Sequence, residues 1–335
     1  MPSFSSLPPE LLTEITKYHP ELLIDVDARI QGLPPNEFAG IDTLRALSHT
    51  CRSLRQVTLP ELWKRVHTIT DARKPERSGW QRDDRWFRPH SKMLRRRMIG
   101  IEKTPYVAPS VRSLTISLIG CNMYTWEPVA HFVRVLGLLP NLRSLTVLNV
   151  LTDIVDLLDS TFKGRTFPTI ETLAIPPIMA ALLPYFPNVH TLIPCGNLNA
   201  TVKEILLSKS REVYEHVHTI HNLPVTREFI QSVQEKIPQL QCISIWQSLS
   251  QAELSLLTSL TFGSLTTLII RVRDDTSQNL YTYYSHAPPP PSVDEVITAA
   301  EGMLRRSNGK GRKVLRVQRR GIQGWVREEN VFVVE

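Results

Sequence analysis

Apolar residues recur in one short pattern through the middle of the chain. Seven eight-residue segments follow, some of them loosely, the order apolar, two variable positions, apolar, one variable position, apolar. Their central apolar residues lie 19 to 31 residues apart and are Leu114, Leu145, Leu173, Leu192, Ile220, Ile243 and Leu268. Such alternation over a few residues indicates a short strand, and its recurrence at these spacings is typical of solenoid repeats.

Helical patterns separate these segments, at residues 127–139, 152–162, 200–210 and 226–237. A helix can return the chain for the next parallel strand while covering one face of the sheet. The units therefore predict an irregular α/β solenoid with parallel strands. The segments resemble leucine-rich repeats, whose signature is L-x-x-L-x-L-x-x-N. Only the copy at Val189 has an asparagine, Asn197, at the ninth position, and this copy has Pro194 at the third apolar position.

Three short amphipathic helices are expected before the solenoid. The first covers Leu7–Ile15. We expect Asp42 to cap the second helix and Pro60 to open the third, which carries Trp63. The residues expected along one side of the second helix are Leu44, Leu47, Cys51 and Leu54. A helical unit this small buries only a modest core, so it needs a partner or the following domain for stability.

The C-terminal residues predict a unit that closes the end of the solenoid. Pro288–Pro291 form a stiff connector. Ser292 is expected to cap a helix that ends near Ser307, and Asn308-Gly309 follows as a stop signal. Two closing strands are expected in KVLRVQRR and NVFVVE.

The net charge of +7 comes from one segment. Residues 73–97 hold ten Lys or Arg and three acids, so the rest of the chain sums to zero. We interpret residues 71–105 as a basic linker. Its aromatic residues Trp80, Trp86 and Phe87 leave a second interpretation open, in which they stack on bases while the cations neutralise phosphates.

The sequence gives no sign of a membrane span or of a signal peptide. The four cysteines are Cys51, Cys121, Cys195 and Cys242, and none has a close cysteine partner. We expect free thiols in a reducing cytoplasm and/or nucleus.

The sequence provides little support for a catalytic or metal-binding site. His216 and His218 would share one face of a strand, which makes a metal site conceivable, whereas His221 should point elsewhere. Cys195 near His190 could imitate a nucleophile and its base. None of the common motifs for hydrolysis, nucleotide binding or zinc proteases occurs. We expect no enzyme activity and no cofactor.

The N-terminal patterns together resemble the F-box motif. That motif reads L-P-x-E-[LI]-[LI]-x-x-I, then L-x-x-L-x-x-[VT]-C-[RK]-x-[WFL], then L-W. Here the first part is LPPELLTEI, the second begins at Leu44 and includes Cys51-Arg52, and the third is Leu62-Trp63. The interval from Ile15 to Leu44 is longer than F-box proteins usually have. It forms an inserted loop or it distorts the second helix.

The resemblance implies a substrate-recognition adaptor of an SCF-type ubiquitin ligase. In such a ligase the F-box binds the Skp adaptor, which links it to a cullin. The implied adaptor-binding residues are Leu7, Pro8, Glu10, Leu11, Leu12, Ile15, Leu44, Leu47, Cys51, Leu54 and Trp63. The candidate substrate face comprises the residue after the first apolar position of six octets, namely Arg112, Arg143, Glu171, His190, His218 and Gln241.

We therefore expect an F-box-like module in residues 1–70, a basic linker in 71–105, a leucine-rich-repeat-like solenoid in 106–285, and a proline connector with a capping unit in 286–335. The alternatives are a non-ligase solenoid scaffold for protein-protein interaction and a nucleic-acid-binding protein. A scaffold whose N-terminal helices cap the solenoid should unfold when residues 1–66 are deleted. A separate docking module should leave the solenoid folded.

Overall fold

The structure is a computed structural model. It describes residues 10, 35–69, 88–118, 121, 126–148, 150–195, 210–223, 225–246, 249–273, 291–320 and 326–334. The described residues divide into two compact units, one ending at Pro176 and the other beginning at Pro177. Each unit contains parallel strands with helices between them.

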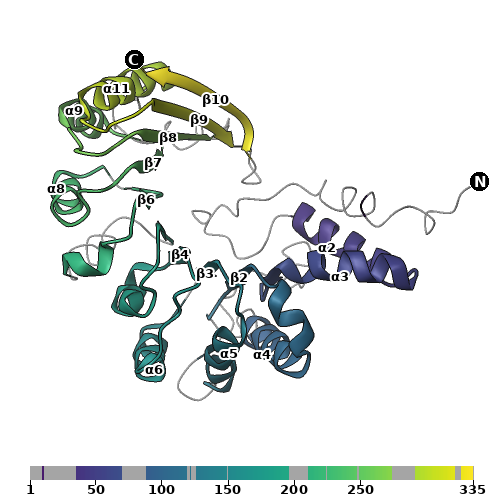
Figure 1. Cartoon of the computed structure of the whole chain (residues 1–335). Coiled ribbons are helices and arrows are strands. Elements are labelled where there is room, and N and C mark those ends of the chain that lie inside the picture. The colour runs from purple at the N-terminus through teal and green to yellow at the C-terminus, as the bar shows by residue number, and fades with distance from the viewer. Residues whose placement is uncertain are drawn as a thin grey trace, which may run out of the picture. The chain divides into compact units, whose positions relative to one another are not determined.

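The first unit begins with two helices and a strand. Helix α2 spans Pro35–Ser48, helix α3 spans Arg52–Lys64, and strand β1 follows at once at Arg65–His67. Helices α2 and α3 pack against each other (Figure 1). The expected first helix, Leu7–Ile15, lies outside the described residues except for Glu10.

The bounds of α2 and α3 correct two expectations. Asp42 does not cap α2 but lies inside it, because the helix already begins at Pro35, whose missing amide hydrogen suits a first turn. Its carboxylate instead accepts a hydrogen bond of 2.8 Å from Arg45. Pro60 does not open a helix but lies inside α3, whose N-cap is Cys51.

The later part of the basic segment is a helix, so the linker interpretation is wrong there. Helix α4 spans Arg88–Lys103 and packs on helix α5, Glu127–Leu138. Leu94, Met98 and Ile101 form one helical stripe and are at most 1% exposed. Lys92, Arg95 and Arg96 are exposed, so these charges occupy the solvent side of an amphipathic helix, whereas burial lowers the pKa of Arg97. Trp80, Trp86 and Phe87 lie outside the described residues.

The repeats of the first unit stack in parallel register. The further elements are η2 Pro105–Ser110, β2 Ser113–Ile116, β3 Ser144–Val147, α6 Thr152–Phe162 and β4 Thr172–Ile175. Strand β1 pairs with β2, β2 with β3, and β3 with β4. Leu114 is in register with Leu145, which is in register with Leu173. Helices α5 and α6 lie on the same side of these strands (Figure 1).

The second unit continues the same architecture. Its elements are η3 Pro177–Tyr185, β5 Thr191–Pro194, η4 Arg211–Tyr214, β6 Thr219–Ile220, α8 Arg227–Lys236, β7 Cys242–Trp246, α9 Gln251–Ser259, β8 Thr267–Arg273, α11 Val293–Arg306, β9 Lys313–Arg320 and β10 Val326–Val334. Strands β5 to β9 pair in chain order and are parallel, whereas β10 pairs with β9 antiparallel.

The predicted fold class is confirmed. All seven central apolar residues of the octets lie in strands and are at most 1% exposed. The patterns at residues 127–139, 152–162 and 226–237 correspond to α5, α6 and α8, whereas residues 200–209 lie outside the described part. The antiparallel β10 is an exception to the parallel arrangement.

The predicted closing segment adds the last two strands, β9 and β10, to the second unit. Ser292 caps α11 as expected: its hydroxyl accepts the amide of Glu295 at 3.2 Å, while the Glu295 carboxylate accepts the amide of Ser292 at 2.7 Å. Helix α11 packs on β8 and β9, and its Ala300 and Leu304 are fully buried. Strand β9 covers the edge of β8 along seven paired residues.

Candidate functional site

Helices α2 and α3 combine buried and half-exposed apolar side chains. Leu44 and Leu54 are 9% and 5% exposed, so they form the small core between the helices. Leu47, Cys51 and Trp63 are half-buried. The described residues of the expected adaptor face therefore separate into core residues and residues that a partner can still cover. Glu10 is exposed, and the other N-terminal residues of this set, Leu7, Pro8, Leu11, Leu12 and Ile15, lie outside the described residues.

Hydroxyl groups fix the turn between the two helices. Ser48 donates to the carbonyl of Arg45 at 2.7 Å, and Thr50 donates to the carbonyl of Leu47 at 2.8 Å. These bonds help to satisfy carbonyl groups at the end of α2, and the Leu47 carbonyl also accepts the amide of Thr50 at 3.2 Å. They hold Leu47 and Cys51 at one end of the helix pair.

Strand β1 joins the helix pair directly to the sheet. Val66 is in register with Leu114 of β2. The amide of Arg112 donates to the carbonyl of Lys64 at 2.9 Å, and the amide of Thr68 donates to the carbonyl of Thr115 at 3.0 Å. The last residue of α3 thus already takes part in the hydrogen bonding of the sheet. Within the first unit, the helix pair has a fixed orientation relative to β2.

Residues 4–69 match the F-box-like family. The N-terminal region is an F-box-like domain. The match includes all of α2, α3 and β1, so the last part of the F-box-like domain is also the first strand of the sheet. F-box proteins are typically non-catalytic adaptors that bind Skp1 within SCF complexes. No curated protein matches the chain.

An ion-pair cluster joins α4 and α5, the two helices that follow the F-box-like domain in the chain. The Glu102 carboxylate lies 2.8 Å from Nδ1 of His131 and 3.1 Å from Nε of Arg134. Burial alone raises the pKa of Glu102, but the hydrogen bonds from His131 and Arg134 outweigh it and lower the pKa below its usual value. Arg95 of α4 pairs with Glu127 of α5 at 3.0 Å. These ion pairs link the basic helix α4 to helix α5 of the first repeat.

Three of the candidate substrate-binding residues form a row in the first unit. Arg112, Arg143 and Glu171 each stand just before a strand. The carbonyl of Arg112 accepts the amide of Arg143 at 2.9 Å, and the carbonyl of Arg143 accepts the amide of Glu171 at 2.9 Å. The Arg143 guanidinium also donates to the Glu171 carboxylate. The two arginines are exposed and the glutamate is half-buried.

The other three form a matching row in the second unit. The carbonyl of His190 accepts the amide of His218 at 3.0 Å, and the carbonyl of His218 accepts the amide of Gln241 at 2.8 Å. The His190 ring centre lies 5.9 Å from that of His218 and 6.5 Å from that of His216. The structure thus brings these residues together. Their binding of a target stays a prediction.

Among the described residues, no group of three or more His, Cys, Asp or Glu is arranged to hold a metal ion. His221 is directed elsewhere, as expected, and its Nδ1 lies 3.4 Å from Nη2 of Arg271.

No helix in the described ranges is long and apolar enough to cross a membrane.

The four cysteines are free thiols, and three of them are poorly placed to react. Cys195 is fully buried, and its thiol donates to the carbonyl of Ile193 at 3.4 Å, which does not suit a nucleophile. Burial raises the pKa of Cys121 to about 12 and that of Cys242 to about 11. The thiolate, which is the reactive form, is therefore scarce at neutral pH.

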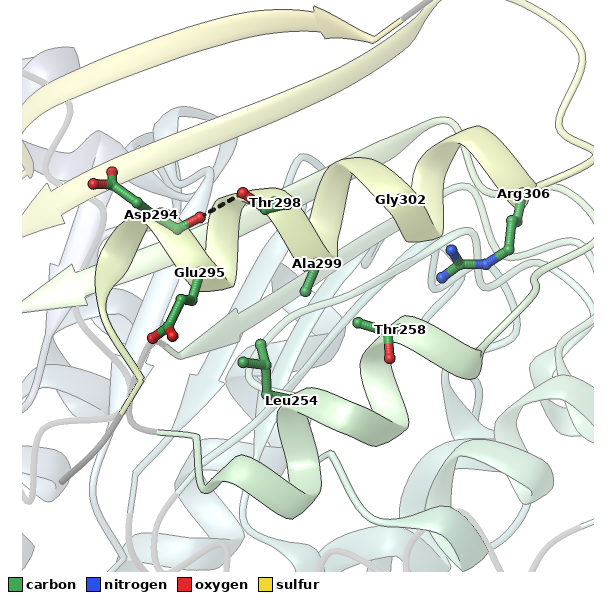
Figure 2. A pocket seen from close by; sticks show the side chains of 8 residues that line it. All are labelled: Leu254, Thr258, Asp294, Glu295, Thr298, Ala299, Gly302 and Arg306. Atoms are coloured by element: carbon green, nitrogen blue, oxygen red, sulfur yellow. Dashed lines mark hydrogen bonds between the residues drawn. The ribbon is translucent and has the colours of Figure 1, made fainter. Parts of the chain in front are cut away.

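A groove of about 450 Å³ lies between α9 and α11 in the second unit. Figure 2 shows the residues that line it. Leu254 and Thr258 line it from α9. The residues that line it from α11 are Asp294, Glu295, Thr298, Ala299, Gly302 and Arg306. Glu295 already serves the helix cap, and the Thr298 hydroxyl donates to the carbonyl of Asp294 at 2.8 Å. The groove has one acidic and one basic end and holds no pair of nucleophile and base.

Proposed function

We propose that this chain is a substrate receptor of an SCF-type ubiquitin ligase. The F-box-like domain binds the Skp adaptor, and the solenoid binds a target protein in the cytoplasm and/or nucleus. The match over residues 4–69 is the observation that carries this proposal. Function of this kind depends on positioning: the receptor raises the effective concentration of the target near the ubiquitin-loaded enzyme. The chain itself performs no chemical step.

The proposal gives different roles to the apolar residues of α2 and α3. Leu47, Cys51 and Trp63 contact the adaptor, because their half-exposed side chains gain further burial on docking. Leu44 and Leu54 act indirectly, because they are buried between the helices and hold the contact residues in place. Docking of half-exposed apolar side chains is typical of helix-mediated recognition.

Pairing of β1 with β2 supports a receptor of fixed geometry. The F-box-like domain and the first repeats share one sheet, and α3 also packs on η2. A receptor benefits from such a connection because a mobile tether would lower the effective concentration of the target. The solenoid strands of the first unit thus hold a defined orientation relative to the adaptor.

Adaptor capture by the purified full-length chain tests the proposal. We expect the wild-type chain to retain purified Skp adaptor and Leu47→Arg to abolish retention, because a charge replaces a contact residue. Replacing both Leu7 and Pro8 by alanine should weaken retention. Leu138→Arg is the control, because Leu138 is 50% exposed and belongs to α5 rather than to the F-box-like domain. The proposal fails if the wild type does not bind, or if Leu47→Arg binds normally while folded.

The scaffold alternative needs a different test from deletion of residues 1–66. That deletion removes Arg65 and Val66 of β1, exposes the edge of β2, and therefore destabilises the solenoid under either function. Adaptor capture separates the two, since a scaffold gives no retention. Nucleic-acid binding predicts salt-dependent retention of single-stranded or duplex probes.

A further inference from the structure

Strand β10 has an exposed apolar edge. Of the described strands, only β9 pairs with it (Figure 1). Its three consecutive apolar residues Val331, Phe332 and Val333 are 56%, 38% and 46% exposed. An edge strand offers unpaired backbone donors and acceptors to any extended chain that reaches it. Apolar side chains beside such an edge favour pairing over solvation.

The two halves of β10 differ in how well they resist pairing. The register with β9 shifts between Val326 and Glu328, and the sequence is charged through Glu329. Bulges and charges are the features by which proteins protect strand edges. Residues 330–334 contain no charge, no proline and no register shift. These features therefore leave Val331, Phe332 and Val333 as the exposed apolar part of the strand.

The strand alternation assigns the exposed side chains to two faces. Phe332 is in register with the fully buried Leu315, so it lies on the face that α11 covers. Val331 and Val333 lie on the opposite face. Glu329 shares that face, and its carboxylate lies 3.5 Å from Nη1 of Arg316. On β10 this face thus presents Glu329 followed by two valines at alternate positions. On β9 it presents Arg316 and Gln318, whose side-chain amide also donates to the Glu329 carboxylate at 3.4 Å.

A second copy of this chain fits the edge poorly. Antiparallel pairing along all nine residues of β10 sets Glu329 of one copy opposite Val331 of the other. Pairing of residues 330–334 alone, with three exposed apolar side chains, provides much less than the roughly 800 Å² per partner of a stable interface. A short extended segment has the matching size. Such segments add to a sheet edge through backbone bonds and take their specificity from alternate side chains.

We propose that the edge of β10 binds an extended segment of the target protein, which adds one strand to the sheet. Apolar residues at alternate positions of the segment pack beside Val331 and Val333, and a Lys or Arg lies beside Glu329. The inference rests on the proposed function in one respect, namely that the segment belongs to a target of the ligase. Binding of the segment itself does not require the adaptor.

Fluorescence anisotropy with synthetic peptides tests the proposal on the full chain. The probe is a labelled nine-residue peptide of alternating valine and threonine that begins with two lysines. A second peptide begins with two glutamates, and a third keeps the lysines but has a central proline. We expect the lysine peptide to bind and the proline peptide to bind at least about tenfold more weakly, because proline removes a backbone donor.

Three variants identify the surface. Val331→Lys combined with Val333→Lys should weaken the lysine peptide at least about tenfold, because lysine protects strand edges. Glu329→Lys should weaken the lysine peptide and strengthen the glutamate peptide, an exchange of preference that misfolding does not produce. Ile178→Lys is the control, because Ile178 is 37% exposed on η3 of the same unit. It should bind as the wild type does.

The proposal is overturned if the wild type binds no lysine peptide, binds the proline peptide equally well, or if Glu329→Lys leaves the preference unchanged. Adaptor capture is measured on the same preparations. A chain that binds the peptide but not the adaptor contradicts the ligase function and leaves the edge site intact. A chain that binds the adaptor but not the peptide contradicts only the edge site.

Discussion

Replacing Gly309 by alanine tests how the segment between α11 and β9 is joined to the rest of the second unit. A Cβ atom at this position would lie 2.5 Å from the carbonyl oxygen of Leu265, closer than real Cβ atoms come to their neighbours. The same carbonyl accepts the Ser307 hydroxyl at 2.6 Å, and the amide of Asn308 donates to the carbonyl of Phe262 at 3.1 Å. The added methyl group must therefore push apart two hydrogen-bonded backbone segments.

The expected cost follows from these contacts. Overpacking against a backbone costs about 2 kcal/mol, and a weakened hydrogen bond adds about 1 kcal/mol. We expect Gly309→Ala to lose about 3 kcal/mol of local stability. Gly137→Ala is the matched control, because a Cβ atom there meets nothing within 4 Å on helix α5. Alanine should stabilise that helix by up to about 1 kcal/mol.

Hydrogen exchange read by mass spectrometry is the suitable assay, because it resolves local opening in a chain of two units. In Gly309→Ala, amides of β8 and β9 should exchange about a hundredfold faster, while α5 and β3 keep their protection. In Gly137→Ala, no region should exchange faster. Unchanged protection of β8 and β9 in Gly309→Ala, or an equal loss in both variants, would refute the reasoning.

Two further predictions concern titratable groups. The folded state lowers the pKa of Glu102 below the usual 4.5, despite the opposing effect of burial, so its stabilising contribution is complete above that pH and is lost as the pH falls through the lowered pKa. Glu102→Gln should therefore make the urea midpoint less dependent on pH between about pH 3 and 5; parallel curves for the two proteins would contradict this. Cys121 and Cys242, with pKa values of about 12 and 11, should react slowly with iodoacetamide at about pH 8 and rapidly after unfolding. Equal rates in both states would show that burial does not control these thiols.

Local pattern predicted the elements whose residues are neighbours in the chain. The octets predicted their strands because each strand needs only an apolar alternation over a few residues. Ser292 predicted the start of α11 because a capping box lies within four residues. The F-box motif predicted helical segments in the region that matches the F-box-like family.

Two predictions were wrong in segments where two local patterns compete. The arginines of α4 indicated a linker because their charge concealed a stripe of three apolar residues, Leu94, Met98 and Ile101. Asp42 is a good capping residue, but Pro35 provides an earlier start for the same helix. In α4, burial of the apolar stripe outweighed the signal of the charges. In α2, the upstream Pro35 outweighed the signal of Asp42.

The sequence by itself determined the repeating units, their order and the resemblance of the N-terminus to an F-box. Only the tertiary structure decided which residues of that region remain available to a partner, namely Leu47 rather than Leu44 and Leu54. It alone decided that β1 belongs to the sheet, because three residues carry too little pattern and become a strand by pairing with β2. Exposure of the β10 edge is likewise set by what packs beside it, since contacts between distant segments leave no local pattern.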